Sequence, residues 1–254
     1  MKNIKLSAVL IVKNEVKKIE KALASLSFCD EIVVIDDGST DQTQKIINKI
    51  APKAKIIERN LNNDFASQRN FALDIAQGQW ILFVDADEVV SSALREEIIG
   101  VVNNKDNEVE GYYLKRKDLF LGKWLEYGET NNVKLLRLAK KNSGKWSGKV
   151  HETWQIKGPT ETLTNPLLHY AHDSINDLTQ KISFYSTIRA QELAKEGLKG
   201  SWWQIILYPK AKFLQNYFFR LGFLDNMPGL LKALEMSFHS FLVRSKLYML
   251  TRKK

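Results

Sequence analysis

The sequence has little cysteine, little proline and no long apolar run. Cys29 is the only cysteine among 254 residues, so no internal disulfide framework can form and we expect a reducing compartment. Five prolines and thirteen glycines, with 44% hydrophobic residues, exclude the collagen-like, low-complexity and disordered classes. No stretch reaches the ~20 apolar residues that a membrane-spanning helix needs. The apolar run at 6–12 is too short for the core of a signal peptide. We therefore expect a globular protein that is neither secreted nor inserted across a membrane.

The positive charge is concentrated in the last third of the chain. The net charge is +9, with 38 basic and 29 acidic residues. Residues 179–254 hold 13 of the basic and only 4 of the acidic residues, which leaves residues 1–178 with no net charge. Such asymmetry is typical of a surface that meets anionic material, either nucleic acid or phospholipid headgroups.

The first hundred residues alternate between strand-like and helix-like patterns. Segments 6–12, 32–35, 54–58 and 80–84 have strand length, and helical spacing follows at 16–26, 43–50, 65–76 and 93–102. For the helix at 43–50 we expect the Ser-Thr-Asp segment 39–41 as the cap. Apolar strands separated by helices are typical of a parallel sheet covered on both faces. The pattern predicts an α/β fold with a mostly parallel, Rossmann-like sheet flanked by helices.

The pattern changes after about residue 105. Segments 109–115, 134–138 and 163–170 have strand character and are joined by loops rich in Gly, Asn and Trp, and from about 175 the spacing is helical. No internal repeat or flexible linker separates these parts. We expect a catalytic domain at 1–174 and a helical C-terminal appendage at 175–254.

Two acidic clusters follow predicted strands. Asp36-Asp37-Gly38-Ser39-Thr40-Asp41 comes after one strand, and Asp85-Ala86-Asp87-Glu88 after another. Ligands bind at the carboxyl ends of the strands in open parallel sheets. A turn with a helix cap explains Gly38 to Asp41 but does not need two adjacent carboxylates. A solvated acidic loop is the alternative for the second cluster, although three carboxylates in four residues favour a bound divalent cation.

Several motifs resemble those of the family 2 glycosyltransferases, which are inverting enzymes with a GT-A fold and nucleotide-sugar donors. The motifs are strand 7–12 followed by Lys-Asn-Glu at 13–15, the acidic segment 36–41, the Arg-Asn pair at 69–70, and Asp-Ala-Asp at 85–87. Segments 146–152 (WSGKVHE), 169–172 (HYAH) and 219–229 look like one subgroup, the lipopolysaccharide inner-core β-1,4-glucosyltransferases. The resemblance therefore implies transfer of glucose to the inner-core saccharide of lipopolysaccharide.

The resemblance implies a donor site and a metal site. The donor-binding residues it points to are Val12, Glu15, Asp36, Asp37, Arg69 and Asp85. Asp37, with Asp36 beside it, would accept hydrogen bonds from a pyrimidine ring and ribose, which selects a uracil-type base. Asp87, in the Asp-x-Asp motif, would hold a Mg²⁺ or Mn²⁺ that neutralises charge on the leaving diphosphate. The alternative for Arg69 is a charge on a helix surface.

Inversion by a single displacement needs a carboxylate base near the acceptor hydroxyl. Glu152 is the candidate because it lies past Asp-x-Asp in a loop rich in Gly and Trp, although many members of the family carry a Glu-Asp pair instead. Asp118 and Glu129 are the reserves. Among the histidines, His169 or His172 is expected to complete the metal's coordination, and an ordinary structural histidine is the alternative.

The C-terminal region combines aromatic and basic residues. Residues 202–223 contain eight aromatic residues interleaved with three cations. This mixture suits the headgroup region of an anionic membrane. A packed helix pair with an aromatic core is the next interpretation, and a nucleic-acid platform ranks below both.

Three further alternatives stay open. Asp85-x-Asp87-x-Val89 also resembles haloacid-dehalogenase-type phosphatases, the chain could be a binding module without turnover, and the acceptor could be a polyprenyl phosphate. The sequence favours a metal-dependent hexosyltransferase that uses a UDP-sugar and a lipid-anchored glycan acceptor. We expect it at the inner face of the cytoplasmic membrane, with no nucleic-acid partner.

Overall fold

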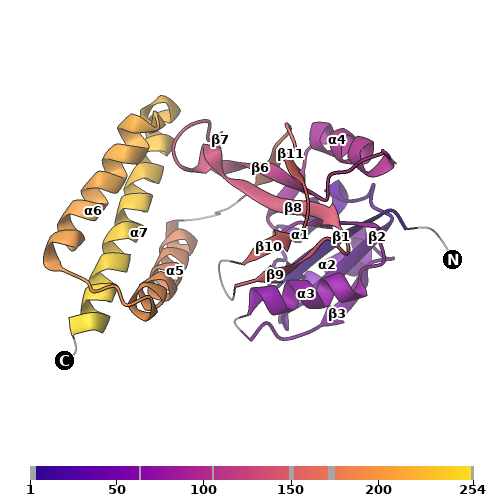
Figure 1. Cartoon of the computed structure of the whole chain (residues 1–254), viewed down its shortest axis with the longest axis horizontal. Coiled ribbons are helices and arrows are strands. Elements are labelled where there is room, and N and C mark those ends of the chain that lie inside the picture. Colours follow the sequence, from indigo (N-terminus) through magenta and orange to yellow (C-terminus); the bar gives the residue numbers. More distant parts are fainter. Residues whose placement is uncertain (1–3, 63, 105, 149–151, 171–174, 253–254) are drawn as a thin grey trace. The chain divides into compact units, whose positions relative to one another are not determined.

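A computed structural model describes residues 4–62, 64–104, 106–148, 152–170 and 175–252. The chain divides into two compact units, which are taken separately below. The first, the sheet unit, comprises Met1–Arg116 and Val133–Tyr170. The second, the helical unit, comprises Lys117–Asn132 and Ala171–Lys254. Residues 117–132 therefore belong to the helical unit, and Figure 1 labels the elements of both units.

The sheet unit is built on four parallel strands in the order β3-β2-β1-β4. Their bounds are Leu6–Val12 (β1), Glu31–Asp36 (β2), Lys55–Glu58 (β3) and Trp80–Phe83 (β4). Beyond β4 the sheet continues through β8 (Lys134–Lys140) and β6 (Gly111–Phe120), and both of these pairings are antiparallel. The order then ends with β12 (Leu167–His169) and β5 (Glu88–Val90), which pair with each other antiparallel. Two short strands, β7 (Lys123–Trp124) and β11 (Thr160–Thr162), pair with β6.

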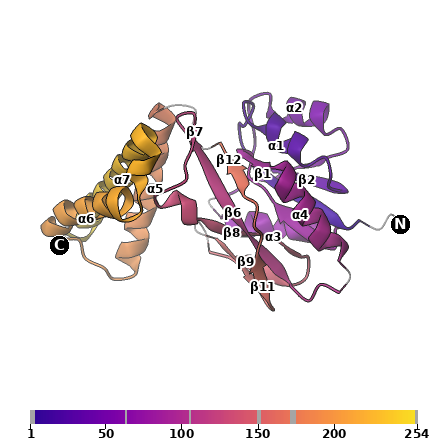
Figure 2. The same ribbon diagram turned by 90° about the horizontal axis from the view of Figure 1, so that it is seen from above.

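Helices cover both faces because the strand residues alternate between two apolar clusters. Ala8, Leu10 and Val12 of β1 join a cluster with α1 (Ile19–Ser25), α2 (Thr43–Ile50) and α4 (Ser92–Asn103). Val9 of β1 faces the opposite cluster, which contains α3 (Phe65–Ile75). This alternation is the period of two that a strand imposes on its side chains. Figure 2 shows α1 and α2 on the same side of β1 and β2. The α/β fold with a helical C-terminal appendage is confirmed.

The helix starts follow their sequence signals, with one correction. The Asp64 carboxylate accepts a hydrogen bond from Ser67 N at 2.8 Å and caps α3. The cap expected for α2 lies differently, because the helix begins after Gln42, which makes no side-chain cap bond. Asp41, one residue earlier, instead accepts from Thr43 N at 2.9 Å. The acidic residue still satisfies a free N–H of the first turn.

A two-stranded hairpin lies against α3. Its strands are β9 (Gly144–Ser147) and β10 (Thr153–Ile156), and Trp146 lies directly opposite Trp154. The two indoles stack with centroids 5.3 Å apart, and each meets Phe83 edge-on at 5.1 Å. A Cβ at Gly144 would lie 2.0 Å from the carbonyl oxygen of Gln155, so only glycine allows the strands to approach this closely. The stacked tryptophans thus hold the hairpin against Phe83, the last residue of β4.

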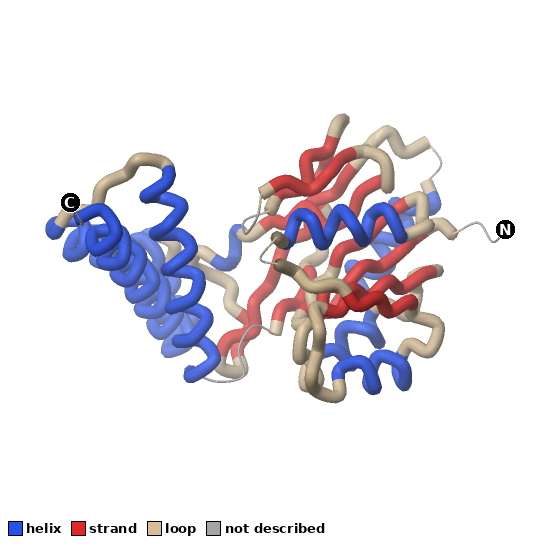
Figure 3. Tube along the Cα trace, turned by 90° about the horizontal axis from the view of Figure 1, so that it is seen from below, coloured by secondary structure: helices blue, strands red, loops and turns tan. Residues whose placement is uncertain are grey.

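The helical unit consists of α5 (Ile175–Lys195), α6 (Trp202–Leu214) and α7 (Asn226–Arg252), with shorter elements before α5 and between α6 and α7 (Figure 3). The shorter elements are a 3₁₀ turn η1 (Thr130–Asn132), a π-helical turn η2 (Gln215–Phe219) and a 3₁₀ turn η3 (Gly222–Asp225). Helix α7 packs against both α5 and α6. Among the described residues, no helix is long and apolar enough to span a membrane.

Candidate active site

The expected donor-binding residues lie at one edge of the sheet unit. Val12 and Asp36 are paired in register at the ends of β1 and β2, and Asp85 follows β4. Because these strands are parallel, their carboxyl ends meet at the same edge. The two acidic clusters are therefore brought together by topology.

Asp36 shapes the first loop of this edge. Its side chain is fully buried, and Oδ1 accepts hydrogen bonds from Ser39 N at 2.9 Å and from Ser39 Oγ at 2.6 Å. Its other oxygen accepts from Gln44 Nε2 at 2.5 Å. Both carboxylate oxygens thus bond to the protein itself, one to Ser39 of the loop and the other to Gln44 of α2. Asp36 therefore holds the loop in its conformation. A direct contact between Asp36 and the donor stays a prediction.

The loops after β1 and β2 are tied to each other. Asn14 N donates to Ser39 Oγ at 3.0 Å, and Asn14 Oδ1 accepts from Thr40 N at 2.8 Å. Glu15 N donates to Thr43 Oγ1 at 2.8 Å. Asn14 and Gly38 have positive φ values of 55° and 69°, the left-handed region that Asn and Gly tolerate best. This network of hydrogen bonds holds the two loops in place without a ligand.

Asp37 lies beside Lys13, which belongs to the Lys-Asn-Glu motif but had been given no role of its own. Its Oδ2 is 2.9 Å from Lys13 Nζ, and its Oδ1 accepts from Leu61 N at 2.6 Å. The Lys13 side chain is more than half exposed, so its ammonium can leave Asp37 when a ligand with its own donors binds. Asp37 is positioned as an acceptor with one oxygen fixed by the backbone and one that can exchange partners.

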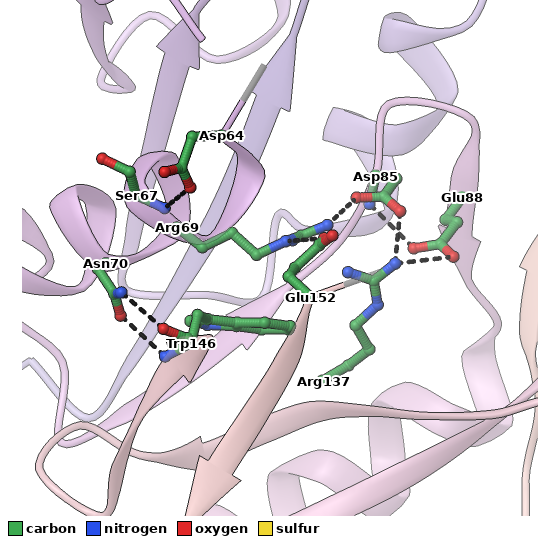
Figure 4. A network of polar contacts seen from close by, with 9 residues as sticks. All are labelled: Asp64, Ser67, Arg69, Asn70, Asp85, Glu88, Arg137, Trp146 and Glu152. Atoms are coloured by element: carbon green, nitrogen blue, oxygen red, sulfur yellow. Dashed lines mark hydrogen bonds and ion pairs between the residues drawn. The ribbon is translucent and has the colours of Figure 1, made fainter. Parts of the chain in front are cut away.

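Two arginines hold Asp85. Arg69 Nη2 lies 3.0 Å from Oδ1, and Arg137 Nη2 contacts Oδ2 (Figure 4). Burial alone raises the pKa of Asp85, but the charges and hydrogen bonds of Arg137 and Arg69 outweigh it and hold the pKa well below its usual range. Asp85 is therefore a fixed carboxylate at neutral pH.

Arg69 also reaches the candidate base. Its Nε donates to Oε1 of Glu152 at 2.8 Å, so one guanidinium bridges Asp85 and Glu152 (Figure 4). Arg69 is buried, and its guanidinium lies 4.8 Å from the ring centre of Trp146. The interpretation of Arg69 as a charge on a helix surface is wrong, because the side chain lies between α3 and the hairpin.

The hairpin brings Glu152 to this place. Asn70 Nδ2 donates to the carbonyl of Trp146 at 2.9 Å, and Trp146 N donates back to Asn70 Oδ1 at 2.9 Å. The Arg-Asn pair of α3 thus fixes both the hairpin backbone and the Glu152 carboxylate. Residues 149–151, His151 among them, lie outside the described residues.

A cavity of about 290 Å³ lies beside Glu152. Tyr113, Arg137, Trp146 and Trp154 help to line it. Three buried N–H groups of these residues have no hydrogen-bond partner in the described part of the chain, and they are Arg137 Nε, Trp146 Nε1 and Trp154 Nε1. Buried donors without partners are costly unless a ligand or water accepts from them. Glu152 and Thr153 also line the cavity, which suits a ligand with hydroxyl groups.

Glu88 contacts both Asp85 and Arg137. It is fully buried, its Oε2 accepts from Asp85 N at 2.9 Å, and its Oε1 lies 3.7 Å from Arg137 Nη2. Burial raises the pKa of Glu88, with the neighbouring Asp85 charge adding to the effect and Arg137 opposing it. Arg137 thus serves two carboxylates that would otherwise face each other.

Asp87 and His169, both expected at the metal, lie together. Asp87 Oδ2 is 3.6 Å from His169 Nε2 and 4.0 Å from Lys18 Nζ. The antiparallel pairing of β5 and β12 places His169 opposite Glu88, next to Asp87. Burial raises the pKa of Asp87, but the hydrogen bond and charge of His169, with a contribution from Lys18, lower it overall.

A carboxylate oxygen and an imidazole nitrogen form a donor set that suits Mn²⁺. Within the described ranges, no group of three or more His, Cys, Asp or Glu side chains is placed to hold a metal ion. A cation here would thus take one or two protein ligands and complete its coordination with phosphate and water, as Mg²⁺ commonly does. His172, the other expected ligand, lies outside the described residues.

Two residues predicted as reserve bases belong to the other unit, and one residue of the site, Arg137, had not been predicted. The reserve bases Asp118 and Glu129 belong to the helical unit, where Glu129 pairs with Lys212 at 2.7 Å. Arg137 was missed by the sequence analysis. The one available signal was its place in the apolar strand Lys134–Lys140, where a buried arginine needs an acidic partner.

The chain is similar to known glycosyltransferases. The model of "Glycosyl transferase family 2" matches residues 7–154. The chain is 30% identical to the lipopolysaccharide core biosynthesis glycosyltransferase LpsC of Rhizobium meliloti, over 96% of this chain and 92% of that protein. It is 29% identical to an uncharacterised glycosyltransferase of Rickettsia typhi, over 98% of this chain and 88% of the relative.

Solved structures share the fold at low sequence identity. Staphylococcus aureus TarS in complex with UDP has a TM-score of 0.51 and 18% identity, covering 97% of this chain and 92% of that one. Glucosyl-3-phosphoglycerate synthase from Mycobacterium tuberculosis, in complex with Mn²⁺, UDP-glucose and phosphoglyceric acid, has a TM-score of 0.50 and 15% identity. That match covers 78% of this chain and 82% of that one. The family model and the full-length relative together show that this chain belongs to glycosyl transferase family 2.

Proposed function

We propose that this protein is a metal-dependent, inverting hexosyltransferase that moves a sugar, glucose first among the candidates, from a UDP-sugar to a lipid-linked saccharide. The observation that carries the proposal is the Arg69 bridge, which joins the carboxylate expected at the donor to the carboxylate expected to be the base. Membership of a transferase family replaces the phosphatase alternative. The complete set of acidic side chains at the sheet edge argues against a module without turnover.

The donor end of the site is assigned to Asp37 and its surroundings. Asp37 would accept hydrogen bonds from the uracil and ribose, displacing the exposed Lys13 ammonium from Oδ2. Val12 and Glu15 are tied to the same loops by backbone groups. The carbonyl of Val12 accepts from Asp37 N, and Glu15 N donates to Thr43 Oγ1. TarS and glucosyl-3-phosphoglycerate synthase carry UDP or UDP-glucose on the same fold, which supports the choice of nucleotide.

The metal end is assigned to Asp87 and His169, which together would hold Mn²⁺ or Mg²⁺. A divalent cation bound there supplies charge neutralisation for the diphosphate that leaves. The neighbouring Lys18 adds positive charge on the same side. Asp85, already held by two arginines, is assigned to ribose contact and to keeping Arg69 in place.

The transfer step uses Glu152. The oxygen of an acceptor hydroxyl forms a bond to the anomeric carbon from the face opposite the diphosphate, and the bond between that carbon and the phosphate oxygen breaks. The Glu152 carboxylate takes the hydroxyl proton, and UDP leaves with the electron pair. Single displacement inverts the anomeric centre. The cavity beside Glu152 would hold the reacting sugar hydroxyls.

The acceptor is assigned from the relative and from the surface of the helical unit. LpsC acts in lipopolysaccharide core biosynthesis, which makes a lipid-anchored inner-core glycan the first candidate, and a polyprenyl phosphate is the second. In the helical unit, large apolar side chains such as Trp202, Phe219 and Met227 are 69%, 83% and 61% exposed. Exposed rings beside lysines suit an anionic membrane surface at the inner face of the cytoplasmic membrane. This exposure weighs against the alternative of an aromatic core.

Transfer from radiolabelled UDP-glucose to lipid-extractable acceptor tests the proposal. Glu152→Gln should lower the transfer rate by about 10²- to 10⁴-fold, the usual contribution of a general base. Glu161→Gln, on exposed β11, is the matched control and should transfer at the wild-type rate. Equal rates in wild type and Glu152→Gln would remove Glu152 from the mechanism. Comparing inner-core glycan with polyprenyl phosphate in the same assay decides between the two acceptors.

A further inference from the structure

A groove of about 800 Å³ lies within the helical unit, between α5, α6, η2 and α7. Three cations from three different helices line it, namely Arg189 of α5, Lys212 of α6 and Arg244 of α7. None of the described residues that line the groove is a carboxylate. Positive charge therefore converges on a cavity that the catalytic edge does not use.

The three cations differ in how far they are neutralised. Lys212 Nζ lies 2.7 Å from Glu129, and Arg189 pairs through Nη1 with Glu192 at 3.1 Å. Arg244 makes no ion pair with any described residue. Its guanidinium lies 4.1 Å from the ring centre of Tyr208. Stacking on the ring orients the planar guanidinium but supplies no counter-charge, so the groove can accept an anion at Arg244.

The remaining wall of the groove is apolar. Leu193 and Val243 are buried at 4% and 5% exposure, whereas Leu214 and Phe219 are 47% and 83% exposed. Leu214 ends α6, and Phe219 ends the π-helical turn η2. Such widened turns recur at functional sites. An exposed apolar rim next to a buried apolar floor offers a path for a hydrocarbon chain.

We propose that this groove is a binding site for an anionic phospholipid. The phosphate headgroup bonds to Arg244, because a guanidinium fork matches phosphate oxygens, and the acyl chain lies along Leu193, Val243 and Phe219. The site extends the proposed membrane association, on which it rests, from general adsorption to recognition of one lipid at one place. The groove belongs to the helical unit, whereas the residues proposed to bind donor and acceptor belong to the sheet unit.

General adsorption and a built site respond differently to single substitutions. Adsorption to an anionic surface gains a similar amount of affinity from each nearby Lys or Arg, whichever residue it is. A built site depends on the residue that contacts the phosphate. Lys210 is an exposed residue of α6 that does not line the groove, so Lys210→Gln removes the same charge as Arg244→Gln without touching the site.

Calorimetric titration of the full chain with dihexanoyl phosphatidic acid, below its micelle concentration, tests the proposal. We expect saturable binding, with about tenfold weaker binding of dihexanoyl phosphatidylcholine and of inorganic phosphate. Arg244→Gln should weaken phosphatidic acid binding about tenfold, and Lys210→Gln by less than about twofold. Arg244→Lys keeps the charge but loses the fork. It should also weaken binding, which covers the case in which the glutamine variant unfolds.

Three outcomes would overturn the groove as a lipid site. They are no binding of the short-chain lipid, equal binding of inorganic phosphate, and equal losses in Arg244→Gln and Lys210→Gln. Co-sedimentation of the wild type with anionic vesicles separates this failure from failure of the membrane proposal. If the protein sediments with vesicles but does not bind the short-chain lipid, membrane association stands and the groove falls. Thermal melting of each variant checks that it is folded.

Discussion

Arg69 Nε and Glu152 Oε1 lie 2.8 Å apart although the two residues are separated by 83 positions in the chain. The same guanidinium reaches Asp85 Oδ1 at 3.0 Å. The residue expected at the donor and the residue expected at the acceptor are thus held by one planar group, which is itself buried against Trp146. Such a bridge fixes the distance between the two halves of a displacement reaction, and small errors in that distance are costly.

Arg69→Lys tests the bridge. Lysine keeps the positive charge but cannot donate from two separated nitrogens to two carboxylates. We expect kcat/KM for sugar transfer to fall about 100-fold, because Glu152 and Asp85 lose their common partner. Arg95→Lys, on the exposed face of α4, is the matched control and should leave kcat/KM for sugar transfer unchanged. Wild-type activity in Arg69→Lys would show that charge alone, without the bridge, is sufficient.

Arg137→Leu should destabilise the sheet unit. The substitution leaves Asp85 and the buried Glu88 without the cation between them, and breaking a buried ion pair on one side costs about 3–5 kcal/mol. Urea unfolding followed by tryptophan fluorescence measures the loss. Adding Glu88→Gln to Arg137→Leu should recover part of it, because one of the two facing carboxylates is removed. A loss below about 0.5 kcal/mol, the usual size for an exposed residue, would mean that Arg137 is not needed for stability.

Glu129 predicts a pH dependence of the helical unit. Burial raises the pKa of Glu129, but the hydrogen bond and charge of Lys212, with help from Asn216 and Arg220, bring it below its ordinary value. A carboxyl with a lowered pKa in the folded state stabilises the fold above its unfolded pKa of about 4.3, and this stability is lost as the pH falls through the lower folded value.

Glu129→Gln should therefore lower the free energy of unfolding at pH 7 by about 0.5 kcal/mol, the scale of a partly exposed pair. The difference from the wild type should shrink as the pH approaches 3. Thermal melts at the two pH values measure it, with Glu161→Gln as the control that changes at neither. A difference that stays constant with pH would show that the loss comes from packing and not from the charge of Glu129.

Local patterns were enough to predict the parallel half of the sheet unit and its acidic edge. The strands β1, β2 and β4 are apolar runs, and parallel topology alone brings Asp37 and Asp85 to one edge. The hydrogen bond between Asn14 and Ser39 is made by the same turn residues that made the acidic segment 36–41 recognisable in the sequence.

The rest of the site depends on pairings between distant segments. Arg137 reaches Asp85 only because β8 runs antiparallel to β4, with Leu138 opposite Leu82. His169 meets Asp87 through the three-residue strands β5 and β12, which are too short to give a periodic signal. The hairpin that carries Glu152 to Arg69 has strands of four residues, held by stacked tryptophans and by Asn70. None of these registers is encoded in a local pattern.

The most direct test of the central claim is calorimetric binding of UDP with and without Mn²⁺. It compares the wild type with Asp87→Ala and with Asp106→Ala, which removes an exposed carboxylate outside the site. The account predicts metal-dependent binding by the wild type and by Asp106→Ala, and its loss in Asp87→Ala. Absence of UDP binding by the wild type in the presence of Mn²⁺, or Mn²⁺-dependent binding that Asp87→Ala leaves intact, would contradict it.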